Sequence, residues 1–150
     1  MKKKLVGWIK MNNIEVYSLC VKICLFLYKN KSLDRESLLY LVSLSDFYHD
    51  NTMQSKNIKN INSLTYYTNI LNKSIAILLA TKLIDLHERI FELSISGCIF
   101  SENIISNKEN RGLIQKIEYI CSNYNCKENL SRVYEEMVSK FIKKKLGGAS

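Results

Sequence analysis

The chain has 150 residues, of which 47% are hydrophobic and 10% aromatic, and this content excludes a fully disordered protein. Its length fits one domain with a sizeable buried core. The formal net charge is +8, but the excess lies wholly on the two ends, because residues 11–139 carry 14 acidic side chains and as many basic ones. The composition therefore does not predict a basic body of the kind that binds nucleic acid over a broad surface.

The first segment, residues 1–10, reads as a basic tail. Its apolar run at residues 5–9 is too short for the core of a signal peptide. The apolar stretch 14–28 contains Glu15 and Lys22 and is shorter than the roughly 20 residues that cross a bilayer. We therefore expect a cytoplasmic protein with no membrane segment.

Two helices are predicted next. Residues 14–28 are apolar on nearly every side, which is typical of a central, buried helix. A turn at 30–32 follows, and either Ser32 or Asp34 can cap a second helix that runs to about residue 48. Residues 50–62 form a polar linker of a length at the upper end for a compact domain.

A third helix begins near residue 63 and is either continuous with, or separate from, a helix at 74–83. Asn72 or Ser74 could cap a separate helix. The apolar residues of the segment 74–83 recur at spacings of three and four, and they are Ile75, Leu78, Leu79 and Leu83. After Lys82 the apolar period changes to two, which predicts strands at 84–87 and 90–96. Glu88 and Arg89 form a two-residue turn between them, or part of a longer one, since the Asn-Gly favoured in tight hairpins is absent.

The second strand of this hairpin is expected to place Leu93 and Ile95 on one face, and Gly97 to break the strand and begin the next helix. Further helices are predicted at 98–105, at about 113–121 and from 127 onward, the last with Tyr134 and Phe141 on its apolar face. Appended helices of this kind commonly serve assembly. Residues 147–150 read as a flexible tail.

The middle of the chain resembles winged-helix proteins. The run Leu83-Ile84-Asp85-Leu86 is similar to the junction between helix and wing, and Phe91-Glu92-Leu93-Ser94-Ile95-Ser96-Gly97 is similar to the pattern that ends many wings. The resemblance covers about residues 14–97. It implies a mainly α fold with some β structure (α+β), a winged-helix core at 11–97 with its hairpin near 84–96, and a helical extension of two or three helices at 98–146. The alternative is a generic α+β hairpin between helices.

A winged helix binds either DNA or another protein. The helix at 74–83 contains no arginine, asparagine or glutamine to read bases, and that at 63–72 offers threonines and asparagines. The candidate nucleic-acid contacts are Lys2, Lys3, Lys4, Lys73, Lys82, Arg89, Lys143, Lys144 and Lys145. The candidate protein-interface residues are Tyr66, Tyr67, Tyr134 and Phe141.

No catalytic motif stands out. The five glycines form neither a dinucleotide-binding fingerprint nor a phosphate-binding loop. The five cysteines are odd in number, which indicates reduced thiols, and Cys20 and Cys24 are expected in the core. With two histidines in the chain, a zinc site is not expected. We therefore expect neither an enzyme nor a bound cofactor or metal.

Over most of its length, the chain also resembles the middle component of bacterial three-component ABC/SMC-like ATPase defence systems, the Lamassu group. This resemblance rests on size, a neutral winged-helix body and appended helices. It implies a non-catalytic accessory subunit that bridges an SMC-like ATPase and an effector in an anti-phage or anti-plasmid complex, with possible non-specific DNA contact through the lysine-rich ends. The alternative is a cytoplasmic winged-helix transcriptional regulator.

Overall fold

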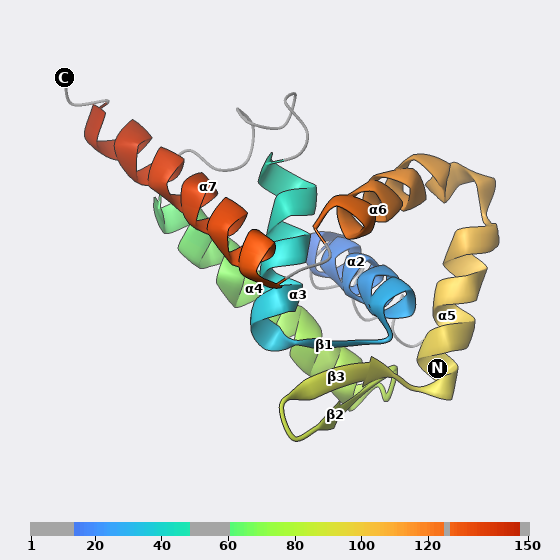
Figure 1. Ribbon diagram of the computed structural model, residues 1–150. Helices are drawn as coiled ribbons and strands as arrows, with labels where there is room; N and C mark the ends of the chain where they lie inside the picture. The colour runs from blue at the N-terminus through green and yellow to red at the C-terminus, as the bar shows by residue number, and fades with distance from the viewer. Residues whose placement is uncertain (1–13, 49–60, 125–126, 148–150) are drawn as a thin grey trace.

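The computed structural model describes residues 14–48, 61–124 and 127–147, and within them the protein is mainly helical with a small three-stranded antiparallel sheet (Figure 1). The predicted mainly α class with some β structure is therefore confirmed. Helix α2, at Ile14–Asn30, lies at the centre of the molecule. Its buried side chains contact α3, α4, α5 and α6, as expected for a helix that is apolar on nearly every side.

The predicted turn at 30–32 is corrected at Ser32, which begins strand β1, at Ser32–Asp34, and this strand pairs with β3. A three-residue strand is too short to reveal an alternating pattern, so only the partner strand defines it. Asp34 caps helix α3, at Arg35–Ser43, by accepting a hydrogen bond from the Ser37 backbone N–H at 2.9 Å. The chain then winds into a π-helical turn, η1, at Leu44–Tyr48, where a continuous α-helix was predicted.

Helix α4 is continuous over Ile61–Ala80, so neither Asn72 nor Ser74 is a cap. Ser74 is buried, and its hydroxyl donates to the Ile70 carbonyl at 2.8 Å, within the same helix. The helix ends with Lys82 in the left-handed region at φ 61°, while the N–H of Leu83 donates to the Leu78 carbonyl. The N–H of Lys82 also donates to the Leu79 carbonyl, and the two bonds together form a Schellman motif, which directs the chain into β2.

The hairpin consists of β2, at Ile84–His87, and β3, at Ile90–Leu93, joined by the two-residue turn of Glu88 and Arg89. The shorter of the two predicted turns is thus the one found. In the sheet, β3 is central and the order is β1–β3–β2. Ile84 and Phe91 are buried on the face of the sheet that is turned toward the helices.

The predicted extent of the hairpin, to residue 96, is wrong, because β3 ends at Leu93. Ser94 caps helix α5, at Ile95–Ser106, and accepts a hydrogen bond from the Gly97 N–H at 3.0 Å. Ile95 is therefore an exposed helical residue and does not share a strand face with Leu93. Gly97 lies in the first turn of α5, where a Cβ would come within 2.0 Å of the Leu83 carbonyl oxygen, so it permits close packing and does not break a strand.

Three further helical segments complete the described chain: the short 3-10 helix η3 at Lys108–Asn110, α6 at Arg111–Asn123 and α7 at Lys127–Gly147. Helix α7 lies along α3 and α4, whereas α5 and α6 contact α2 (Figure 1). Ile104 of α5, Ile120 of α6 and Met137 of α7 are buried in the same core as α2. The predicted tail at 1–10 and nearly all of the linker at 50–62 lie outside the described residues, and the division into 11–97 and 98–146 stays a prediction.

Candidate protein and nucleic-acid interaction surfaces

The solvent-facing side of α4, here named the α4 face, consists of the exposed residues Thr65, Tyr66, Asn69, Lys73, Ala76 and Ala80. They recur at spacings of three and four, which places them along one side of the helix. Lys73 is the sole charged residue of α4. Beside this face, the Arg35 guanidinium donates a hydrogen bond to the Asn72 side-chain oxygen. The α4 face is thus polar and nearly uncharged.

The outward face of the hairpin is acidic. Asp85 and Glu92 are exposed and lie directly opposite each other in the register of β2 and β3. Like charges in that position repel. The turn adds Glu88 and Arg89, both exposed, so one cation stands beside three carboxylates. This distribution disfavours contact with phosphates.

Three of the candidate nucleic-acid contacts have described side chains, and all three are exposed: Lys73, Lys82 and Arg89. Lys73 lies on α4, Lys82 follows the C-terminus of this helix, and Arg89 lies in the hairpin turn. The three cations therefore come from three separate segments of the chain. Lys2, Lys3 and Lys4 lie outside the described residues. Residues 143–145 fall in the last turns of α7, but their side chains are also outside the description.

Three of the four candidate interface aromatics have described side chains, and their environments differ. Tyr66 is 58% exposed on the α4 face. Tyr67, the next residue, is buried, and its hydroxyl donates to Asp46 at 2.7 Å, so it is a core residue. Tyr134 of α7 is half-buried and packs against Tyr40 of α3, with ring centroids 4.7 Å apart and ring planes inclined at 36°. The side chain of Phe141 is outside the described part of the chain.

Asp46 is the centre of a polar cluster inside the protein that sequence reasoning missed. It lies in the π-helical turn η1 and is buried. Its carboxylate accepts from Tyr67 of α4 and forms an ion pair with Lys22 of α2. Burial, followed by the negative charge of Asp46 and the hydrogen bond to it, raises the pKa of Tyr67 well above its ordinary value. The cluster joins three elements, which a pattern confined to single elements cannot reveal.

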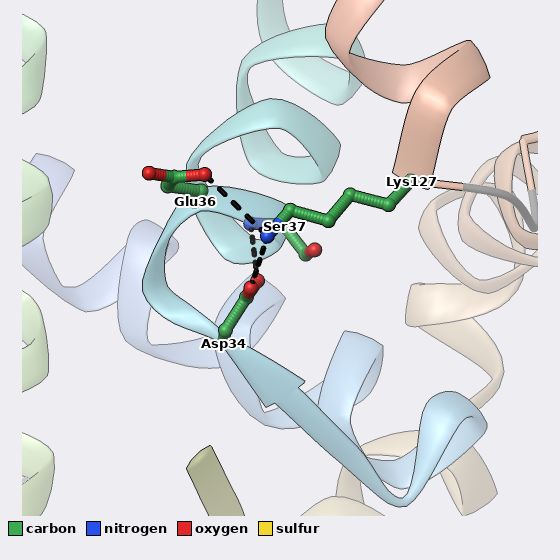
Figure 2. A network of polar contacts seen from close by, with 4 residues as sticks. All are labelled: Asp34, Glu36, Ser37 and Lys127. Carbon is green, nitrogen blue, oxygen red and sulfur yellow. Dashed lines mark hydrogen bonds and ion pairs between the residues drawn. The ribbon is translucent and has the colours of Figure 1, made fainter. Parts of the chain in front are cut away.

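A second polar cluster joins the start of α3 to the start of α7 (Figure 2). The Lys127 ammonium lies 2.5 Å from the Asp34 carboxylate and 3.5 Å from that of Glu36. Burial by itself raises the pKa of Asp34, but the hydrogen bonds from Lys127 and Ser37 outweigh it, so that this pKa lies below its ordinary value. The hydrogen bond to Asp34 raises the pKa of Lys127. The cluster positions α7 against α3 through charge.

The described thiols are free, and the pKa of three of them is raised. Cys20 and Cys24 are buried, as predicted. Burial raises the pKa of Cys20 to about 12, against a smaller lowering by the hydrogen bond to Ser74, and burial also raises the pKa of Cys24 and Cys121. Because the thiolate is the nucleophile, these shifts disfavour cysteine chemistry at neutral pH.

The described residues contain no evident metal centre, and a cleft among them is small. No group of three or more His, Cys, Asp or Glu among them is placed to hold a metal ion. A cleft of about 210 Å³ lies between α2, α5 and α6, and Tyr17, Val21 and Leu113 contribute to its walls. Ligand pockets usually measure about 300–1,000 Å³, so this cleft is small for a cofactor.

Among helices in the described ranges, none combines the length and apolar character required to span a bilayer. No protein-family model matches the chain, and no similar protein was found among curated sequences or solved structures.

Proposed function

We propose that this chain is a non-catalytic winged-helix subunit that binds proteins within a larger complex. Support for the winged helix comes from the element order α2, β1, α3, α4, β2, β3, with β3 at the centre of the sheet. It also comes from the resemblance of residues 83–86 and 91–97 to the ends of a wing. In this assignment α4 takes the place of the recognition helix and the β2–β3 hairpin that of the wing.

The observation that carries the choice of a protein partner is the charge of these two elements. Lys73 is the one charged residue of α4, and the outward face of the hairpin pairs Asp85 with Glu92. A duplex attracts proteins chiefly through the cations that neutralise its phosphates. The α4 face and hairpin supply few cations and several carboxylates, so they suit a protein surface better than DNA.

Exposed apolar side chains on the same two elements support this choice. Tyr66 lies on the α4 face, and Leu86 and Ile90 are exposed on the hairpin. Protein interfaces are enriched in aromatic residues and depleted of charge at their centres. We therefore place Tyr66 at the centre of the surface that binds the partner.

The resemblance to the Lamassu group supplies the identity of the partners. We propose an SMC-like ATPase and an effector subunit of an anti-phage or anti-plasmid complex in the cytoplasm, with this chain as the bridge between them. ATP, magnesium and catalysis belong to the partners in this proposal. The lysine-rich ends of the chain supply non-specific DNA contact when the complex assembles.

The test is co-purification with an SMC-like ATPase encoded beside this chain. We expect a stable complex with the wild-type chain and its loss in Tyr66→Lys. Tyr119→Lys is the matched control, because Tyr119 is 51% exposed but lies on α6. A complex that survives Tyr66→Lys would contradict the assignment of the α4 face, and absence of any complex would contradict the proposed subunit role.

The second candidate is a DNA-binding transcriptional regulator. It is favoured by Asn69 and Lys73 on the α4 face and by Arg35, which is held beside that face by Asn72. Fluorescence anisotropy of the isolated chain with duplex DNA separates the two functions. Tight, sequence-specific binding at about 200 mM salt would favour the regulator, whereas weak binding that vanishes with salt is expected for the subunit.

A further inference from the structure

Strand β2 forms a free edge of the sheet. It pairs with β3 on one side, and β3 in turn pairs with β1. Figure 1 shows β2 on the outside of the molecule, at the side of the sheet away from β1. On that side, no backbone hydrogen bond from another described residue reaches Ile84 or Leu86.

The hairpin geometry determines which groups this edge offers. The two-residue turn makes His87 and Ile90 a hydrogen-bonded pair, and because such pairs alternate with non-bonded ones, Asp85 and Glu92 form the next. The N–H and C=O groups of Ile84 and Leu86 therefore point away from β3. An edge with such groups can accept a further strand.

The side chains of β2 are complementary to a second copy of the same strand. Leu86 is 46% exposed on the inward face of the sheet, and Asp85 and His87 are exposed on the outward face. When two β2 strands run antiparallel with Leu86 opposite Leu86, each Asp85 lies opposite the other copy's His87. Opposed residues of antiparallel strands share a face. The inward face of the joined sheets therefore pairs leucine with leucine, and the outward face pairs aspartate with histidine. The register centred on Asp85 instead opposes two carboxylates.

We propose that two copies of this chain associate through their β2 edges, in the register centred on Leu86. The two Leu86 residues exchange both of their backbone hydrogen bonds, and each Asp85 carboxylate accepts a hydrogen bond from the other copy's His87. The two sheets then become one continuous sheet across a two-fold axis. The dimer is weak and reversible, because so short a strand buries much less surface than the roughly 1,200 Å² of a stable complex. This inference does not depend on the proposed function.

Sedimentation equilibrium of the full chain, over a range of concentrations at low salt, tests the proposal. We expect the average mass to rise toward that of a dimer for the wild type and to stay at the monomer value for Leu86→Lys. His87→Glu opposes two carboxylates and is expected to abolish association. The double variant Asp85→Lys with His87→Glu places opposite charges at the same opposed positions and is expected to restore the dimer.

Ile99→Lys is the matched control, because Ile99 is 55% exposed on α5, outside the sheet, and this variant should dimerise like the wild type. Circular dichroism melting curves verify that all variants fold. A wild type that stays monomeric at every concentration overturns the proposal. Dimers that persist in both Leu86→Lys and His87→Glu overturn it too. A monomeric chain that binds a different protein through β2, with no such binding by Leu86→Lys, would assign the edge to a strand of that protein instead.

Discussion

Two lysines occupy backbone positions at which glycine is usual. Lys31 follows α2 with φ 68°, and Lys82 follows α4 with φ 61°. The left-handed conformation costs a residue with a Cβ about 1–2 kcal/mol. Both helices nevertheless end there, because the N–H of Lys31 bonds to the Leu27 carbonyl and the N–H of Leu83 to the Leu78 carbonyl. The hydrogen bonds of the helix ends thus offset local strain at each lysine.

Lys82→Gly should therefore stabilise the protein. We expect the free energy of unfolding to increase by about 1 kcal/mol, since glycine adopts this φ without strain. Urea denaturation followed by circular dichroism measures the change. The control is Lys73→Gly in the interior of α4, where glycine should cost about 1 kcal/mol. A destabilised Lys82→Gly would contradict the Schellman assignment.

Gly97 is the residue on which the packing of α5 against the hairpin depends. In Gly97→Ala the new Cβ would lie 2.0 Å from the Leu83 carbonyl oxygen, and backbone must move to accommodate it. We expect a decrease of about 3 kcal/mol in the free energy of unfolding. Gly112→Ala in α6 is the matched control, because its Cβ would meet nothing within 4 Å, and it should gain about 0.5–1 kcal/mol. Equal stabilities of the two variants in urea would refute this packing.

At the scale of elements, apolar spacing predicted the helices and the hairpin, but it missed the short strand that is defined only by its pairing with another strand. The spacing of Ile75 and Leu78 predicted the last turns of α4, although the helix ends at Ala80 and the predicted end at residue 83 is wrong, and the change of period after Lys82 predicted the hairpin. Strand β1 could not be read from its three residues, because its pairing partner β3 is distant in the sequence. The strand-like alternation at 93–96 was misleading, because Ser94 is a helix cap whose hydroxyl also bonds the Lys82 carbonyl.

The junction of β1, α3 and α7 should become less stable in acid. The pKa of Asp34 is lower in the folded protein than its ordinary value of about 3.9, so ionised Asp34 stabilises the fold above that pH. This contribution disappears as the pH falls through the lower, folded pKa. In Asp34→Asn the cap to Ser37 persists, but the ion pair with Lys127 is gone.

We therefore expect Asp34→Asn to be slightly less stable than the wild type at pH 7, and this difference to shrink below about pH 4. Thermal melting at several pH values measures the difference. Asp85→Asn, an exposed hairpin residue that faces Glu92, should show no such decrease in stability at pH 7. A stability difference for Asp34→Asn that is constant with pH would show that the carboxylate charge does not contribute.

At the scale of the whole molecule, one core joins the segments on both sides of Gly97. Ile23 of α2, Leu78 of α4, Ile120 of α6 and Leu130 of α7 belong to the same cluster of buried residues. The helical content of these segments followed from their periodicity, but their arrangement did not. The candidate surfaces were only partly predictable for the same reason. Tyr66 and Tyr67 are neighbours in sequence, yet Tyr66 is exposed, whereas Tyr67 is buried and its hydroxyl donates to Asp46 of another element.

The separation of charge between ends and body leads to the last prediction. Lys143, Lys144 and Lys145 carry three of the excess charges, whereas Lys73, Lys82 and Arg89 carry three charges of a body that is neutral overall. In the first variant, the three lysines of α7 are changed to glutamine, and in the second, the three basic residues of the body are. The two variants therefore lose equal charge at different places. If the ends bind DNA, the first variant should have the weaker affinity for a duplex.

The slope of log affinity against log salt should also become shallower for this variant, by as much as about 0.9 for each phosphate that a lysine no longer neutralises. The second variant should bind nearly as the wild type does, because Lys73 lies on the polar α4 face and Arg89 in the turn of the acidic hairpin. Fluorescence anisotropy at about 50 and about 200 mM salt measures both quantities. The reverse order of effects would place the nucleic-acid surface on α4 and the hairpin, and so would favour a DNA-binding regulator over a protein-binding subunit.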